Sequence, residues 1–363
     1  MKKPLLTYLK DIFAFSRIVD DDQELQGLAK ADDLLSQLVT NKKVPGLAIC
    51  VRKEGKSYLQ KGYGFADIEN KVLVDPQSSI FRIASVSKPI AATALAHMVA
   101  DGFIDLDASF YTYVPYYPKK KWDFTIRQLA SHTAGIRSYL GKEYGLNEPY
   151  SIKESIAIFK DDDLLFEPGT RYQYTSYDWV LISLAIQEIT GIPFATYVYE
   201  KVLLPLGLKN TIAANRLGVD ATFTKDTNLH MTTFYSKNRL GFREAIPVNN
   251  HFKLAGGGYL ATAEDVAFFG QAFLDKKVLN DAVLNQFLRS ETIHDKPLYY
   301  GLGWQVSKDT SGRNFYGHIG NGVGGYSNFF VYPEQNIVIS ILINCTNPEI
   351  QNELDEVIEC LFL

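Results

Sequence analysis

Ser85 and Lys88 are the first residues whose types and spacing could do chemistry. They lie three residues apart in "FRIASVSKPIAATALAHMVADG", which spans residues 81–102. Residues three apart share one face of a helix, so the Ser85 hydroxyl and the Lys88 amine can meet. Apolar surroundings favour a neutral lysine, which can take the proton of a serine that attacks a carbonyl. The spacing therefore predicts a nucleophile and its base, the alternative being a chance Ser-x-x-Lys whose lysine extends into water.

Tyr174 and Ser176 form a second candidate, in a Tyr-Thr-Ser that precedes a predicted helix. An acyl-transfer site must also deliver a proton to the leaving group, and a tyrosine hydroxyl can relay it. Residues 177–191 repeat their apolar side chains at helical spacing and end on glycine. In the alternative interpretation, Tyr174 is one of 22 tyrosines and Ser176 caps this helix.

A glycine-rich segment around His318, residues 316–333, is the third candidate. Its glycines would let the backbone approach a ligand closely, so that an edge-strand N–H could point at a substrate oxyanion. A nucleotide-binding loop is not indicated, because Gly-Lys-Ser/Thr is lacking and a strand pattern follows where a helix is required. His318 has no partner at metal-ligand spacing, so no metal site is predicted. The run from Gly325 to Phe329 lacks the last glycine of a Gly-x-Ser-x-Gly elbow, which argues against an ordinary α/β-hydrolase.

The composition is that of an ordinary globular protein. The 363 residues carry a formal net charge of −4, which gives no field to attract nucleic acid, so we expect a small-molecule or peptide substrate instead. Three cysteines, Cys50, Cys345 and Cys360, are odd in number and scattered, which predicts neither a disulfide framework nor a zinc site. No cofactor is indicated.

The first residues, "MKKPLLTYLKDIFAFSRIVDDD", contain two lysines and then apolar residues. Lys10 and Asp11 interrupt the apolar run before a signal-peptide core or a membrane span is complete. The sequence as written therefore predicts a cytoplasmic protein without a membrane span, or an exported one if a leader was removed. Compartment and oligomeric state stay open.

The elements that must position these residues can be predicted from the periodicity. Strand-like runs at both ends of the chain and helical patterns between them predict one antiparallel sheet, built from both ends, beside a mostly helical middle. The predicted fold class is α+β. We expect an extension over residues 1–30 and a single domain over 31–363, with a sheet part at about 31–80 and 295–363 and a helical part at about 81–294. The predicted elements are hairpins over 45–66 and 328–344 and helices over 85–101, 177–191, 262–275 and 348–363.

Taken in chain order, Ser-Val-Ser-Lys at 85–88, Tyr-Thr-Ser at 174–176 and His-Ile-Gly at 318–320 resemble the three signatures of the serine β-lactamase and penicillin-binding protein superfamily. The resemblance is closest to the class C-like branch, which contains class C β-lactamases, D-Ala-D-Ala carboxypeptidases, D-aminopeptidases, related esterases and an animal mitochondrial β-lactamase-like protein. It extends from about residue 30 to the end and implies a β-lactamase/transpeptidase-like fold. Further resembling segments are "VPGLAICVRKEG", "TIRQLASHTAGI", "FEPGTRYQY", "LAGGGYLATAEDVAFFGQAFL" and "YGLGWQV".

The resemblance implies a role for each candidate. Ser85 would be the acylated nucleophile, Lys88 its activating partner and Tyr174 a general base or proton relay, and which of the last two is the base stays open. The oxyanion hole would be formed by the backbone N–H of Ser85 and that of Asn321, which follows Gly320. Many members carry lysine at the position of His318, so a cation for a substrate carboxylate would here depend on pH, with KM for such substrates rising between about pH 5 and 8.

Two departures from the class C-like pattern bear on the substrate. Ser176 stands where that pattern has Asn, and Ile319 stands where the classical triplet has Thr, and both changes would weaken binding of carboxylate-tailed substrates. We therefore expect a serine hydrolase of esters or D-amino-acid peptides before an efficient β-lactamase. The alternative is a catalytically weak penicillin-binding or scaffold protein of the same fold. The loops at about 137–165 and 212–253 are expected to wall the cleft.

Overall fold

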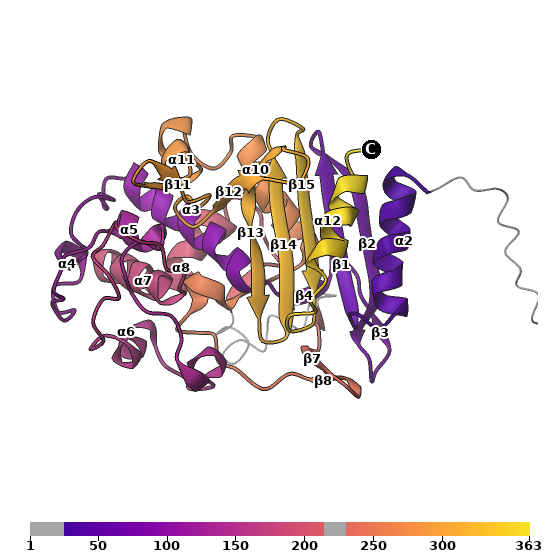
Figure 1. Ribbon diagram of the computed structural model, residues 1–363, viewed down its shortest axis with the longest axis horizontal. Helices are drawn as coiled ribbons and strands as arrows, with labels where there is room; N and C mark the ends of the chain where they lie inside the picture. The colour runs from indigo at the N-terminus through magenta and orange to yellow at the C-terminus, as the bar shows by residue number, and fades with distance from the viewer. Residues whose placement is uncertain (1–24, 214–229) are drawn as a thin grey trace, which may run out of the picture.

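The computed structural model describes residues 25–213 and 230–363, and one large antiparallel sheet dominates it (Figure 1). Its seven strands are β1 (Gly46–Lys53), β2 (Lys56–Asp67), β3 (Val72–Leu73), β12 (Gln305–Lys308), β13 (Asn314–Gly322), β14 (Gly325–Tyr332) and β15 (Ile337–Ile343). They are arranged in the order β12-β13-β14-β15-β1-β2-β3, so the last long strand lies beside the first. This confirms the predicted α+β fold with one sheet built from both chain ends.

Side chains alternate along each strand, so the sheet has two faces, and both are buried. In β1, Leu47 and Ile49 pack on one face beneath α2 (Gly27–Thr40) and α12 (Gln351–Cys360). Ala48 and Cys50 belong to the core on the opposite face, where α10 (Ala263–Leu274) packs on β1, β14 and β15. The sheet is thus covered on both sides, which is why every residue of β15 is buried.

The long predicted elements are found close to their predicted bounds. The hairpin of β1 and β2 turns at Glu54 and Gly55, and that of β14 and β15 lies within the predicted 328–344 except that its first strand begins at Gly325. The predicted helix over 177–191 is α7 (Tyr177–Thr190), which ends at a left-handed Gly191. The predicted helix over 262–275 is α10, whose Thr262 side chain accepts the N–H of Asp265.

Three differences concern placement. Helix α2 begins at Gly27 and packs on the sheet, so residues 27–30 belong to the folded body rather than to the predicted extension. Helix α10 covers the sheet although it lies in the segment predicted to form the helical part. That segment also contains short strands. Residues 1–24 of the predicted extension and 214–229 of the second predicted loop lie outside the described residues.

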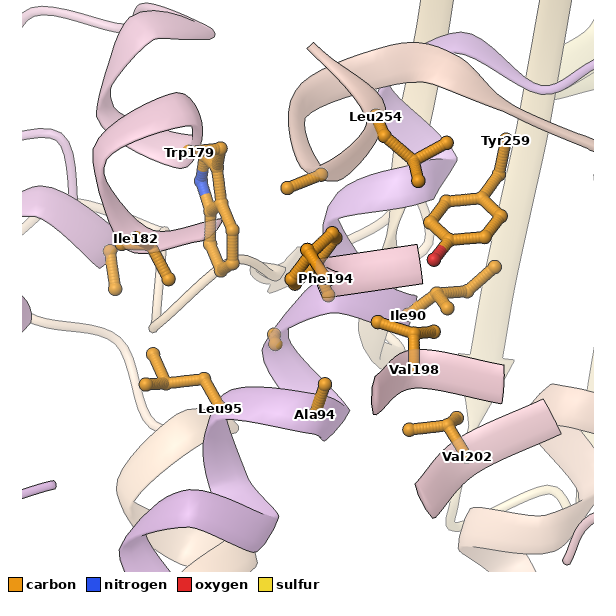
Figure 2. Close-up of a cluster of buried hydrophobic side chains, with 14 of the residues drawn as sticks. Ile90, Ala94, Leu95, Trp179, Ile182, Phe194, Val198, Val202, Leu254 and Tyr259 are labelled. Carbon is orange, nitrogen blue, oxygen red and sulfur yellow. The ribbon is translucent and has the colours of Figure 1, made fainter. Parts of the chain in front are cut away.

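The remaining elements surround α3 (Ser87–Ala100), the central helix of the molecule. Figure 2 shows its side chains Ile90, Ala94 and Leu95 amid Trp179 and Ile182 of α7 and apolar residues of the neighbouring helices. Because α3 is buried on almost every side, it has no polar face and any charged group on it is desolvated. The other α-helices among the described residues are α4 (Phe110–Tyr113), α5 (Ile126–Ala130), α6 (Ile152–Ser155), α8 (Phe194–Val198) and α11 (Asp281–Phe287). Further helical turns are η1 (Ala84–Val86), η2 (Gly141–Gly145), η3 (Ile156–Ile158), η4 (Tyr199–Leu203) and η5 (Leu254–Gly258).

The smaller strands lie outside the main sheet. A four-stranded sheet has the order β5-β9-β4-β6, and two short hairpins are formed by β7 with β8 and by β10 with β11. Their bounds are β4 (Ser79–Arg82), β5 (Ile212–Ala213), β6 (His230–Met231), β7 (Tyr235–Asn238), β8 (Gly241–Glu244), β9 (Tyr259–Ala261), β10 (Thr292–Ile293) and β11 (Lys296–Pro297). Strand β4 matters most for function, because it leads directly into the turn that carries Ser85.

A search of the described ranges for membrane spans finds no single helix of sufficient length and apolar composition. Two consecutive helical segments, Tyr177–Thr190 and Phe194–Leu203, are long and apolar enough only when they are taken together, and the chain bends by 84° between them. Both segments contribute side chains to the buried core, as Figure 2 shows for Trp179 and Val198.

Candidate active site

Ser85 lies in a tight turn rather than in the helix predicted from its position. The turn η1 joins β4 to α3, and α3 itself begins at Ser87. Ala84 has a φ of 44°, a left-handed conformation that residues with a Cβ rarely adopt. The turn therefore holds Ser85 just before α3, while Lys88 occupies the first turn of the helix.

The structure brings Ser85, Lys88 and Tyr174 together. Lys88 Nζ lies 3.0 Å from Ser85 Oγ, and Tyr174 donates its hydroxyl hydrogen to Ser85 Oγ over 2.8 Å. Lys88 Nζ also donates to the carbonyl oxygen of Gly256 in η5 over 2.6 Å. Three segments far apart in sequence thus place a nucleophile between two groups that can move its proton.

Burial sets the protonation of these groups. The Lys88 side chain is fully buried, and desolvation lowers its pKa from 10.5 to about 7, with the charge of Asp178 acting weakly in the opposite direction. Burial raises the pKa of Tyr174 far above its ordinary value. Near neutral pH, a substantial fraction of Lys88 is therefore an uncharged amine, whereas Tyr174 keeps its proton.

A buried pair beneath Tyr174, His132 with Asp178, was not singled out from the sequence. His132 Nδ1 lies 2.7 Å from Asp178 Oδ2, and neither side chain is exposed. The ring centroid of His132 is 4.4 Å from that of Tyr174. Burial lowers the pKa of His132 and raises that of Asp178, so it disfavours the charged form of both groups. The only signal in the sequence is Asp178, an acidic residue within an otherwise mainly apolar helical segment.

Gly320 on β13 allows the sheet to contact the turn that carries Ser85. A Cβ at Gly320 would lie 2.4 Å from the carbonyl oxygen of Ile83 and 3.0 Å from the backbone nitrogen of Ser85. Any side chain at this position would push η1 away from the sheet. The glycine-rich segment predicted to precede a strand is therefore part of a strand.

The backbone N–H of Asn321 points along the same edge of β13 as that of Ile319. Ile319 donates its N–H to the side-chain oxygen of Gln305, on β12, over 3.1 Å. Alternate residues of a strand direct their N–H groups to the same side. Strand β12 pairs only as far as Gly317, so the N–H of Asn321 points past its end, where Asn321 and Ser85 line one cavity.

His318 differs from its predicted role as a pH-dependent cation. It is 2% exposed, its Nδ1–H donates to the carbonyl oxygen of Ile319 over 2.6 Å, and its Nε2 accepts the hydroxyl hydrogen of Tyr300 over 3.1 Å. Desolvation, with the charge of Lys88 adding to it, lowers the pKa of His318 to about 3. The ring is consequently neutral between pH 5 and 8, which contradicts the predicted change of KM.

Ile319 differs from its predicted effect, whereas for Ser176 only the alternative interpretation as a helix cap is wrong. The Ile319 side chain packs with the core beneath α12, on the face of β13 opposite to Gly320, so its apolar character does not alter the cleft as predicted. Ser176 occupies the N-cap position of α7 but makes no capping hydrogen bond. Its Oγ lies 3.4 Å from Lys88 Nζ instead, so it belongs to the polar cluster around Ser85.

Ser85 opens into a small cavity of about 50 Å³. The predicted loop walls are confirmed, because Tyr139 and Tyr144 line it from one loop and Asn250 and Lys253 from the other. The other described lining residues are Ala84, Ser176, Gly256, Gly257, Asn321, Gly322 and Val323. A larger cavity of about 540 Å³, beside α6 and the end of α7, contains none of the candidate residues and so lies apart from the site around Ser85. No group of three or more His, Cys, Asp or Glu residues in the described ranges could hold a metal ion.

Comparison with known proteins decides the family. The profile of the family described as Beta-lactamase matches residues 31–360. The chain belongs to the β-lactamase family. Among curated relatives is the human serine beta-lactamase-like protein LACTB, mitochondrial, to which the chain is 25% identical over 429 aligned residues. The alignment covers 88% of this chain and 77% of the relative.

Solved structures of other proteins share the fold. The D-amino acid amidase from Ochrobactrum anthropi SV3 superposes with a TM-score of 0.77 at 20% identity, over 92% of this chain and 98% of the amidase. EstCE1, a hydrolase with promiscuous acyltransferase activity, superposes with a TM-score of 0.75 at 18% identity, over 92% of this chain and 98% of EstCE1. These matches confirm the predicted β-lactamase/transpeptidase-like fold.

Proposed function

We propose that the protein is a serine hydrolase that forms an acyl-enzyme on Ser85. The observation that carries the proposal is the position of Ser85 Oγ, 3.0 Å from Lys88 Nζ and 2.8 Å from the Tyr174 hydroxyl. Membership of the β-lactamase family supports it. The expected substrates are small esters and D-amino-acid amides or peptides, ahead of β-lactams.

In the proposed acylation step, Ser85 Oγ attacks the substrate carbonyl while its proton passes to the neutral amine of Lys88. The resulting oxyanion accepts hydrogen bonds from the backbone N–H groups of Ser85 and Asn321. Tyr174 donates its proton to the leaving group and regains one from the Lys88 ammonium. The carbonyl–leaving group bond breaks, and the acyl group remains on Ser85 as an ester.

Deacylation uses the same groups with water in place of Ser85. A water molecule gives a proton to Lys88 or Tyr174 and attacks the acyl carbonyl, and Ser85 Oγ leaves with the returned proton. The protonation states favour Lys88 as the base, because its pKa is near 7 while that of Tyr174 is raised far above the working range.

Covalent labelling tests the nucleophile. The protein is incubated with a fluorophosphonate and, separately, with a fluorescent penicillin, and adducts are mapped by mass spectrometry. We expect an adduct on Ser85 in the native protein and none in Ser85→Ala, whereas Ser57→Ala, which alters an exposed serine on β2, is labelled normally. Absence of any Ser85 adduct in folded protein would refute the proposal.

Turnover separates the hydrolase from the alternative of a catalytically weak penicillin-binding or scaffold protein. Rates are measured with p-nitrophenyl acetate, D-alanyl-D-alanine peptides and a chromogenic cephalosporin. The hydrolase predicts repeated turnover of the ester or peptide that is lost in Ser85→Ala. A single stoichiometric burst without turnover of any of the three would instead support the weak penicillin-binding protein.

A further inference from the structure

Lys253 gives the cleft a positive charge that the proposed reaction on Ser85 does not use. Among the described residues that line the cavity, Lys253 is the only one with a formal charge, and none is acidic. The remaining lining side chains that carry polar groups are uncharged tyrosine, asparagine and serine residues. The cavity therefore presents one cation and several neutral hydrogen-bonding groups to whatever enters it.

The surroundings of Lys253 hold its ammonium in place without neutralising it. Its Nζ donates to the carbonyl oxygen of Tyr144 over 2.9 Å and lies 5.1 Å from the ring centroid of Tyr139. A lysine ammonium has three N–H donors, and Tyr144 uses one of them. No carboxylate in the described parts of the chain acts on this group, whereas the nearby charge of Arg82 opposes it. Burial and Arg82 lower the pKa of Lys253 to about 8, so the ammonium still predominates at pH 7.

We propose that Lys253 is a specificity residue that binds a carboxylate of the substrate while Ser85 attacks its carbonyl. This inference rests on the proposed hydrolase function and names the substrate class. A buried ammonium without an anionic partner is unfavourable, and a substrate carboxylate would supply that partner together with a charge-assisted hydrogen bond. In this proposal, Lys253 rather than His318 is the cation that binds the substrate carboxylate.

The size of the cavity restricts the substrate further. Ser85 and Lys253 line the same small cavity, so a substrate that meets both residues carries its carboxylate a short distance from the reacting carbonyl. Half-esters of short dicarboxylic acids and N-acyl derivatives of acidic D-amino acids satisfy this condition.

A matched pair of esters measures the preference. The substrates are mono-p-nitrophenyl glutarate and its uncharged methyl ester. We expect the ratio of their kcat/KM values, charged over uncharged, to fall about tenfold in Lys253→Met, as for the loss of one charged hydrogen bond. Lys253→Arg keeps the positive charge and should retain most of the preference. Lys276→Met, which removes an exposed lysine paired with Asp281, controls for net charge and should keep the wild-type ratio.

Binding without chemistry separates this inference from the proposed function. In Ser85→Ala, calorimetry should show monomethyl glutarate, which carries one carboxylate, binding about tenfold more tightly than the uncharged dimethyl glutarate, and Ser85→Ala with Lys253→Met should bind both equally. Melting curves verify that each variant is folded. Equal affinities in Ser85→Ala, or an unchanged ester ratio in Lys253→Met, would overturn the role of Lys253 even if Ser85 is labelled. Charge-selective binding without Ser85 labelling would overturn the hydrolase and leave the anion site.

Discussion

Lys88 on α3 and His318 on β13 are both buried titratable residues close to Tyr174. We call the two walls of the cleft that they belong to the helix side and the strand side. The Lys88 amine lies 4.6 Å from the ring centroid of Tyr174, and the His318 ring centroid lies 6.0 Å from it. Desolvation lowers the pKa of both, from 10.5 to about 7 for Lys88 and from 6.5 to about 3 for His318. The same physical effect brings lysine into the physiological range and takes histidine out of it.

The partners of the two side chains reinforce this difference. Lys88 directs its amine at Ser85 Oγ, whereas both ring nitrogens of His318 are engaged, by Tyr300 and by the carbonyl of Ile319. The helix side therefore supplies side chains that can react, while the strand side supplies backbone N–H groups and shape. A buried titratable residue is a candidate base only if its free lone pair faces the reacting atom and its shifted pKa remains near the working pH.

Replacing the reactive side chain gives the largest expected effect. Lys88→Met keeps the length and apolar stem of the side chain but removes its amine, so kcat/KM for a chromogenic ester should fall by about 10³-fold. Lys276→Met serves as the control for loss of a lysine. Activity near that of the wild type in Lys88→Met would mean that Tyr174 alone activates Ser85.

Altering the shape of the strand side should have the next largest effect. In Gly320→Ala, the new Cβ would collide with the backbone of Ile83 and shift the N–H of Ser85 relative to that of Asn321. We expect kcat to fall by about 10²-fold, as for the loss of one oxyanion donor. The control is Gly145→Ala, whose Cβ would contact only the flexible end of Ile246. Unimpaired turnover in Gly320→Ala would remove the strand from the oxyanion site.

The smallest expected effect on rate is in the pH profile, which should distinguish Lys88 from His318. Only the neutral amine of Lys88 accepts a proton, so kcat/KM for an uncharged ester should fall about tenfold per pH unit below pH 7 and level off above it. His318→Phe should keep this midpoint, because His318 is already neutral there, while destabilising the fold by about 1–3 kcal/mol through the unpaired Tyr300 hydroxyl. A midpoint that shifts in His318→Phe would show that the histidine titrates with the reaction.

The three central residues of the site could be predicted from the sequence, but the charge states of its titratable groups could not. Ser85, Lys88 and Tyr174 could be found because each lies in a short segment with its own pattern and in a known order along the chain. The ionisation of His318 depends on how deeply tertiary packing buries it, which no local pattern reveals. The same holds for Lys253, whose importance arises from the absence of acidic residues among the described lining of a cavity built from several segments.

Some features could have been predicted from strand geometry. The alternation of side chains in a strand places Ile319 on the face opposite to Gly320, but the glycines around them favoured a loop before the strand. The left-handed conformation of Ala84 could not be predicted, since residues other than glycine rarely adopt positive φ. Long elements with clear periodicity, such as α7 and the two hairpins, were predicted correctly because packing and local preference agree there.

The pairing of β15 with β1 has a consequence for how the protein folds during synthesis. Leu47 lies opposite Ile343, so β1 must wait for a strand that is synthesised only after the helical part of the chain. Until then, β13 and β14 cannot join the rest of the sheet, and the N–H of Asn321 has no fixed position relative to Ser85. Contacts so distant in sequence form slowly. A nascent chain that stops before β15 would therefore expose apolar strand edges to chaperones and proteases while carrying its reactive serine in an unassembled cleft.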